Sequence, residues 1–260
     1  METLNNVVLT IQNYMSNYVL IIALLGAGLW FSFRLGFIQV RGFGEGMRRT
    51  FGGLFSKKGE AGADGMSSFQ ALATAIAAQV GTGNIAGAAT ALAIGGPGAI
   101  FWMWIAAFLG MATIYAEAIM AQKYKTVGVD GQVTGGPVYY IRAAFKGTFG
   151  KVLAGIFAIL ITLALGFMGN AVQSNSIAAS FHTAFGIPQW IMGVVVAVIA
   201  LFVFAGGIER IAKVTETIVP LMAALYIVGA LIVIIYNYKN IPYAFASIFI
   251  GAFAPQSVVG

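Results

Sequence analysis

The sequence contains no cysteine among its 260 residues. Disulfide bridges, zinc–thiolate sites, iron–sulfur clusters and cysteine nucleophiles are therefore excluded. Charged side chains are also scarce, at 8% of the chain, whereas soluble domains carry roughly 25%. A chain with so few charges cannot cover a core with a water-facing surface. The two shortages exclude an ordinary soluble domain and all chemistry that depends on a thiol.

Apolar residues dominate instead, at 60% of the chain, with a mean hydropathy of +0.90 and 34 glycines. Glycine is commoner in transmembrane helices than in soluble ones. A bilayer-spanning helix needs about 20 apolar residues. Six stretches approach or exceed that length, and the sequence therefore predicts an all-α integral membrane protein partnered by the lipid bilayer. The six predicted spans are Tyr18–Phe33, Phe69–Ile94, Ala99–Ala121, Val152–Ala179, Trp190–Gly206 and Ile218–Tyr236.

The basic residues predict how the chain crosses the bilayer. Thirteen of the fourteen lysines and arginines fall in alternate connections between the predicted spans, and Lys239 is the exception. The positive-inside rule places those connections in the cytoplasm and the N-terminus outside, as a multi-pass protein of the plasma membrane. The net charge of +6 is thus a sign of topology. No nucleic-acid partner is predicted, because no patch of interleaved aromatic and basic residues is present.

The middle of the second predicted span is unusually polar, with the run Gly81-Thr82-Gly83-Asn84. Backbone that leaves the helix at such a depth is tolerated only where it is buried or lines a cavity. Unwinding would free carbonyl groups for a cation, while the following half-helix would present N–H groups to an anion. The Asn84 amide adds one more donor and acceptor. These residues predict a binding site for a small ligand.

An alternative interpretation of this run is structural. Gly83 and Gly87 have the spacing of a helix-packing face, with Thr82 bonded back into its own helix. That alternative stays open at the level of sequence. A dinucleotide-binding loop is excluded because no strand precedes the glycines, and a Walker phosphate loop is excluded because no Gly-Lys-Ser/Thr follows.

A second polar cluster lies in the fourth predicted span. Asn170, Gln173 and Ser174 stand at i, i+3 and i+4 and share one helix face. Such a face in a membrane helix looks into a bundle or a cavity. It either binds a ligand or forms a hydrogen-bond network between helices. No catalytic residues are predicted anywhere, because no carboxylate pair, His-Glu-x-x-His motif or Ser/His/Asp set is present; the chain is not expected to be an enzyme or to hold a cofactor.

Several motifs together resemble those of the alanine or glycine:cation symporter family. They occur in the family's order across essentially the whole chain, so the resemblance is specific. The motifs are Gly81–Gly87, Gly95–Gly98 with Phe101–Trp104, Tyr115–Ala118, Gly135–Tyr140, Gly169–Asn170 with Gln173–Ser176, and Gly206–Ile208 with Arg210–Lys213.

The resemblance implies a LeuT-like inverted-repeat transporter fold of the APC superfamily. Residues 1–66 would form an extra N-terminal transmembrane helix and a cytoplasmic interfacial segment. Residues 67–236 would form the first five-helix repeat, with a broken helix at 79–87. Residues 237–260 would form an external loop and the start of the second repeat. Family members are longer, so the chain is expected to be truncated at its C-terminal end relative to them.

The function implied by the resemblance is sodium-coupled symport of alanine or glycine by alternating access. The implied substrate-binding residues are Gly81, Thr82, Gly83, Asn84 and Gln173, with the backbone of Thr82 and Gly83 on the carboxylate. Sodium as the coupling ion would lie near Gln79, Val80 and Asn84. A span interior with amides and carbonyls but almost no ionisable groups favours sodium over a proton. Two alternatives stay open: a channel or passive pore, and a non-transporting membrane fragment that lacks the second repeat. No oligomeric state is predicted.

Overall fold

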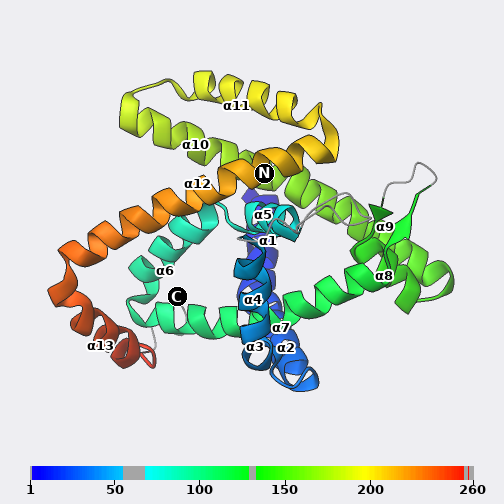
Figure 1. The fold of residues 1–260 in the computed structure, drawn as a ribbon, viewed down its shortest axis with the longest axis horizontal. Helices are drawn as coiled ribbons and strands as arrows, with labels where there is room; N and C mark the ends of the chain where they lie inside the picture. Colours follow the sequence, from blue (N-terminus) through cyan, green and yellow to red (C-terminus); the bar gives the residue numbers. More distant parts are fainter. Residues whose placement is uncertain (1, 55–67, 129–132, 255–256, 258–260) are drawn as a thin grey trace.

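The structure is a computed structural model that describes residues 2–54, 68–128, 133–254 and 257 (Figure 1). Residues 55–66 of the predicted interfacial segment, and 255–256 and 258–260 of the predicted second-repeat start, lie outside the described residues. The described chain is nearly all helical, in agreement with the prediction. One short antiparallel hairpin departs from it: β1 (Thr126–Val127) pairs with β2 (Val133–Thr134). Both strands consist of β-branched residues, which favour extended backbone.

The N-terminal helix is longer than the hydropathy predicts. Helix α1 (Glu2–Tyr14), the π-helical stretch η1 (Met15–Leu20) and α2 (Ile21–Arg34) follow one another without a break. The predicted span began only at Tyr18, because hydropathy marks the apolar part of a helix, whereas helical hydrogen bonding continues through polar residues. A turn then leads into two further helices, α3 (Ile38–Arg41) and α4 (Phe43–Leu54).

The next part of the chain contains an interrupted helix. Helix α5 (Ser68–Gln79) ends at the Gly-Thr-Gly-Asn run, and the π-helical stretch η2 (Gly83–Gly87) then leads into α6 (Ala88–Gly95). The turn at Gly96, with φ +70°, reverses the chain into α7 (Gly98–Lys123). Glycine takes this positive φ at no steric cost.

The C-terminal half is built from longer helices. After α8 (Pro137–Ala144), one long helix runs through α9 (Gly147–Leu163), the π-helical η3 (Ala164–Gly169) and α10 (Asn170–Phe185). Helix α11 folds back beside α10, and α13 lies beside the start of α7 (Figure 1). The remaining elements are α11 (Gln189–Phe204), α12 (Gly207–Tyr236), the 3₁₀ turn η4 (Tyr238–Asn240) and α13 (Ile241–Gly251).

Four helices of the described chain are long and apolar enough to cross a membrane: Asn5–Arg34, Gly98–Lys123, Gly147–Phe185 and Gly207–Tyr236. Two shorter apolar helices, Gly83–Gly95 and Gln189–Phe204, accompany them. The six predicted spans thus correspond to four full-length helices, one interrupted helix and one shorter helix. This is the composition of a multi-pass membrane protein.

Small residues form the contacts between the helices. Helix α2 packs on α7, and α5 packs on α12. At the α2–α7 contact, a Cβ added to Gly28 would lie 2.8 Å from Cβ of Leu109. Small residues let helix backbones approach closely in membranes. Most large apolar side chains point outward, where lipid can cover them. The buried apolar residues of the described chain are mostly alanines: Ala73, Ala99, Leu109, Ala112, Ala154, Ala178, Met192, Ala212, Val219 and Ala252.

Candidate functional site

The helix break lies between Gln79 and Gly83. The Val80 N–H donates to the Ile76 carbonyl at 2.8 Å, and the next backbone bond that bridges the break runs from the Asn84 N–H to the Gly81 carbonyl at 3.1 Å. The last carbonyls of a helix and the first N–H groups of the next lack helical partners. The break therefore presents the carbonyl end of α5 and the N–H end of the helix that follows at one place.

The Asn84 side chain folds back onto the break. Its Oδ1 accepts a hydrogen bond from the Gly81 N–H at 3.2 Å. The amide of a residue three positions further along the chain satisfies an N–H that the interrupted helix leaves open, as a side chain at position N3 does when it reaches back to the N-cap N–H in a capping box. Asn84 thus holds the backbone in its unwound conformation. Its side chain nevertheless belongs to an exposed residue, which leaves it accessible to a ligand.

Gln173 reaches the same break from α10. Its Oε1 accepts a hydrogen bond from the Thr82 N–H at 3.1 Å. A methyl group added at Gly81 would overlap the Gln173 amide, so the approach depends on glycine at that position. The two polar clusters singled out in the sequence, 91 residues apart, therefore meet at one point in space.

Asn170 and Ser174, the other two residues of the second polar cluster, form no hydrogen bond with the break in the described chain. The Asn170 Nδ2 donates to the Gly166 carbonyl of its own helix at 3.0 Å, and no hydrogen bond joins Ser174 to another described residue. The predicted shared face of Asn170, Gln173 and Ser174 thus contributes one residue, Gln173, to the break. Its bond to Thr82 is a contact between helices, as the structural interpretation of this cluster also expected.

The structural interpretation of Gly83 and Gly87 is wrong for the described chain. A Cβ added at either position would have no heavy atom within 4 Å, so no helix packs against these glycines. The Thr82 hydroxyl makes no hydrogen bond back into its own helix among the described residues; the backbone N–H of Thr82 is the group that is engaged. Open space borders the glycines, as a small ligand would require.

Helix α5, which leads into the break, is held against α12 by polar pairs. The Gln70 Nε2 donates to Oε2 of Glu216 at 2.9 Å, and the hydroxyls of Thr74 and Thr215 lie 3.3 Å apart. These pairs were not among the residues predicted from the sequence. Gln70 and Thr74 stand at i and i+4 in an otherwise apolar stretch, and that spacing could have identified one polar helix face.

The helix after the break is tied indirectly to α13. The Trp102 Nε1 donates to the Ala252 carbonyl at 2.7 Å, and the Ser257 hydroxyl donates to the Gly95 carbonyl at 2.7 Å. Phe101 and Trp102 also pack against Phe253. The end of α13 is thus joined to the turn between α6 and α7. No local sequence pattern predicts these two hydrogen bonds, because both acceptors are backbone carbonyls, which every residue carries.

Oxygen atoms of the backbone and of neutral amides are the cation ligands available at the break. No three His, Asp or Glu side chains gather as a metal site among the described residues. The carbonyls of Gln79 and Val80 lie at the C-terminal end of α5, where the helix dipole is negative. Oδ1 of Asn84 accepts the Gly81 N–H at the same break.

The chain is similar to known proteins over its whole length. The model of the sodium:alanine symporter family matches residues 1–260, the whole chain. The chain belongs to this family. The resemblance predicted from the sequence motifs is thereby confirmed, and the family is one of transporters and not of enzymes.

Three members of the sodium:alanine symporter family illustrate the similarity. The chain is 43% identical over 246 residues to the sodium/alanine symporter of Methanococcus maripaludis, covering 94% of the chain and 53% of that protein. It is 39% identical over 206 residues to the sodium/proton-dependent alanine carrier protein of Bacillus sp. PS3, covering 78% and 44%. It is 40% identical over 259 residues to a probable sodium/glutamine symporter of Bacillus subtilis, covering 100% and 52%. The chain thus spans about half the length of these relatives.

Proposed function

We propose that this chain contributes the first half of a sodium-coupled symporter for a small neutral amino acid, alanine or glycine. One observation carries the proposal: two neutral amide oxygens, from Asn84 and Gln173, accept the N–H groups of Gly81 and Thr82 at a helix break. Donors that already hold two oxygen atoms at one place can hold the two oxygens of a carboxylate. Membership of the sodium:alanine symporter family supports the same substrate class.

When the substrate binds, its carboxylate replaces the neutral amide oxygens of Asn84 and Gln173 as the acceptor of the backbone N–H groups, and the carboxylate is the stronger acceptor. Hydrogen bonds to an ionised carboxylate are roughly twice as strong as those between neutral groups, and the positive end of the following helix adds to the attraction. The backbone of Thr82 and Gly83, together with the Gly81 N–H that Asn84 releases, would then hold the carboxylate. The amides of Asn84 and Gln173 turn away from the backbone and contact the substrate or the ion. The open space beside Gly83 and Gly87 receives a short side chain.

Sodium is the proposed coupling ion. The carbonyls of Gln79 and Val80 and the amide oxygen of Asn84 would coordinate it beside the substrate, so that each ligand strengthens the binding of the other. No titratable side chain stands at residues 79–87, which favours sodium over a proton. Two of the three relatives above are named for sodium with alanine or glutamine, and the third for sodium and proton with alanine.

The proposed architecture is the LeuT-like inverted repeat, with alternating access around the break. Residues 1–66 would precede the first repeat at 67–236, and α13 would open the second repeat within 237–260. The N-terminus would lie outside the plasma membrane. Support comes from the interrupted helix within one repeat and from the alternation of basic connections.

Thermal unfolding of the detergent-solubilised chain tests the proposal. A ligand at 100 times its Kd stabilises a protein by about 2.7 kcal/mol. We expect L-alanine or glycine to raise the unfolding temperature in sodium chloride but not in choline chloride, and L-glutamine to act as the size control. An equal shift in both salts would contradict sodium coupling and would favour a passive pore. The absence of any shift would favour a non-transporting fragment.

The variant Asn84→Ala separates a ligand response from a general loss of stability. If the chain is half of a transporter, Asn84→Ala abolishes the alanine-dependent rise in unfolding temperature and also lowers the unfolding temperature without ligand. In a membrane fragment without a site it lowers the unfolding temperature alone, since there is no response to lose.

A further inference from the structure

Two neighbouring hollows lie beside α7, the first at the end of α2 and the second against α3 and α4. The first has a volume of about 510 Å³ and the second about 630 Å³. Both are lined by Ile38 and Tyr115, so they adjoin each other. The walls of the first hollow include Phe33, Arg34, Ile38, Arg41, Tyr115 and Ile119. It therefore combines two guanidinium groups with apolar and aromatic side chains.

The turn between α2 and α3 fixes the two arginines near each other. The Phe37 N–H donates to the Ser32 carbonyl at 2.7 Å, which closes the turn, and Gly36 supplies the positive φ of 60° that it requires. One Arg41 Nη2 lies 3.4 Å from the Leu35 carbonyl, so this side chain folds back over the turn towards the end of α2. Arg34 stands at that end.

Buried polar contacts hold α3 under α2. The Ser32 hydroxyl, fully buried, donates to the Gly28 carbonyl at 2.7 Å and accepts from Nε2 of Gln39 at 2.8 Å. Gln39 is also part of the wall of the second hollow. The position of the arginines therefore follows from packed structure and not from a free loop.

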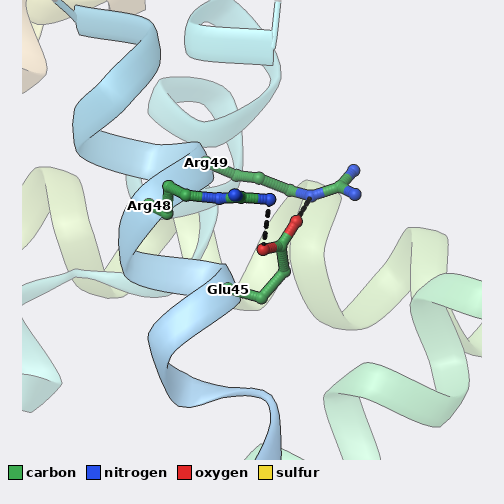
Figure 2. Close-up of polar contacts among 3 residues, drawn as sticks. All are labelled: Glu45, Arg48 and Arg49. Atoms are coloured by element: carbon green, nitrogen blue, oxygen red, sulfur yellow. Dashed lines mark hydrogen bonds and ion pairs between the residues drawn. The ribbon is translucent and has the colours of Figure 1, made fainter.

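The hollows carry an excess of positive charge. Neither Arg34 nor Arg41 forms an ion pair with a carboxylate in the described part of the chain. The second hollow includes one carboxylate, Glu45. Arg48 and Arg49 both form ion pairs with Glu45 (Figure 2), and each nitrogen–oxygen distance is 2.6 Å. The Glu45 charge is thus already compensated, and the two arginines of the first hollow are left for an external anion.

The apolar walls point to the kind of anion. Phe33 is 68% exposed and Ile119 45% exposed, and both belong to helices long enough to cross a membrane. Arg34 ends one of these helices, and in a bilayer the end of such a helix would lie where headgroups meet acyl chains. A guanidinium fork binds phosphate oxygens in pairs. Basic pockets between transmembrane helices bind anionic lipid headgroups.

We propose that the corner formed by α2, α3 and α7 is a binding site for an anionic phospholipid. The phosphodiester lies on Arg34 and Arg41, and an acyl chain lies along Phe33 and Ile119. The Tyr115 side chain, 42% exposed, forms the border between the two hollows. The site depends on the chain spanning a membrane and is independent of the proposed transport function.

Native mass spectrometry of the detergent-solubilised 260-residue chain tests the site, with phosphatidylglycerol and phosphatidylcholine of the same acyl chains as probes. Two guanidinium contacts predict binding of phosphatidylglycerol about thirtyfold tighter than phosphatidylcholine. We expect Arg34→Gln/Arg41→Gln to remove this preference. The matched control Arg142→Gln/Lys146→Gln removes the same charge from α8 and the residue before α9, and should keep it.

A charge-conserving variant keeps the test informative if Arg34→Gln/Arg41→Gln misfolds. Arg34→Lys/Arg41→Lys keeps the basic residues that orient the chain but lacks the planar fork, so we expect a preference reduced several-fold. Three results would overturn the proposal: both glutamine pairs lose the preference equally, the lysine pair binds as the parent chain does, or sn-glycerol 1-phosphate displaces phosphatidylglycerol completely. The last would indicate a site for a free phosphate.

Discussion

The Thr82 N–H and the Gln173 Oε1 are joined by a hydrogen bond of 3.1 Å across 91 residues of sequence. This contact fastens the break between α5 and η2 to α10, a helix that lies elsewhere in the chain. Any ligand that takes the Thr82 N–H must first release Gln173. We therefore expect occupancy of the break to be coupled to the position of α10.

Gln173→Leu tests this coupling directly. The substitution leaves the Thr82 N–H without its acceptor, which we expect to destabilise the chain by about 1 kcal/mol and to weaken the sodium-dependent response to alanine. The unfolding temperature with and without ligand measures both effects. Asn175→Leu is the control, because Asn175 is an exposed amide of the same helix. Equal effects of the two variants would show that the Gln173 contact has no special role.

Gly81→Ala tests the close approach of the two clusters. The added methyl group would overlap the Gln173 amide, so the side chain must move away and the Thr82 bond is lost. We expect the alanine response to fall as it does in Gln173→Leu, and the double variant to add little. Gly87→Ala adds the same methyl group in open space. It should change the free energy of unfolding by less than about 0.5 kcal/mol. Full additivity of the double variant would contradict a shared contact.

Gly98→Ala separates α7 from α13. A methyl group at Gly98 would overlap the Gly251 carbonyl and lie 2.6 Å from the Ala252 nitrogen; backbone atoms cannot yield as a flexible side chain can. We expect a loss of about 1–3 kcal/mol and weakened protection of the α13 amides in hydrogen exchange. Gly110→Ala lies in the same helix with no atom within 4 Å. An unchanged α13 in Gly98→Ala would refute this close approach.

The Glu45 cluster predicts a pH dependence. The hydrogen bonds from Arg49 and Arg48 hold the pKa of the Glu45 carboxyl below its ordinary value of 4.5. A lowered pKa in the folded chain means that the pair stabilises α4 above pH 4.5 and that this stabilisation disappears as the pH falls through the folded pKa. Glu45→Gln should remove this dependence. Hydrogen exchange of the α4 amides, compared between parent and variant at each pH, measures it.

For Glu45, a contradiction would be the same pH profile in the parent chain and in Glu45→Gln. Raising the salt concentration provides a second check, because Glu45, Arg48 and Arg49 are solvent-exposed and exposed pairs are screened by salt. The difference between parent and variant should therefore shrink at high ionic strength.

The sequence predicted the helices and the polar break because both depend on local composition. A Gly-Thr-Gly-Asn run inside an apolar stretch is visible without any knowledge of its neighbours. The partner of Gln173 was not predictable, because the shared face of Asn170, Gln173 and Ser174 has no local feature that says which of them crosses to another helix.

Polar pairs between residues far apart in the sequence could not be predicted for a similar reason. Glu216 lies three residues after Lys213 in the sequence, while its bond to Gln70 spans 146 positions. The Trp102 donor meets a backbone carbonyl at Ala252, and every residue carries such a carbonyl. The predicted ends of the helices also differ from those in the structure. Hydropathy marks the part of a helix that matches the thickness of a bilayer, whereas the hydrogen-bonded helix continues beyond that part.

The alanines at the helix contacts have a mechanical consequence. A leucine interdigitated between two helices leaves a hole when they part, whereas a methyl group such as that of Ala112 or Ala212, both nearly fully buried, leaves almost none. Lipid tails can fill so shallow a gap, and no side chain has to change its rotamer. Helices joined through such methyl groups therefore leave little unfilled volume when they separate, so their parting carries only a small cavity cost.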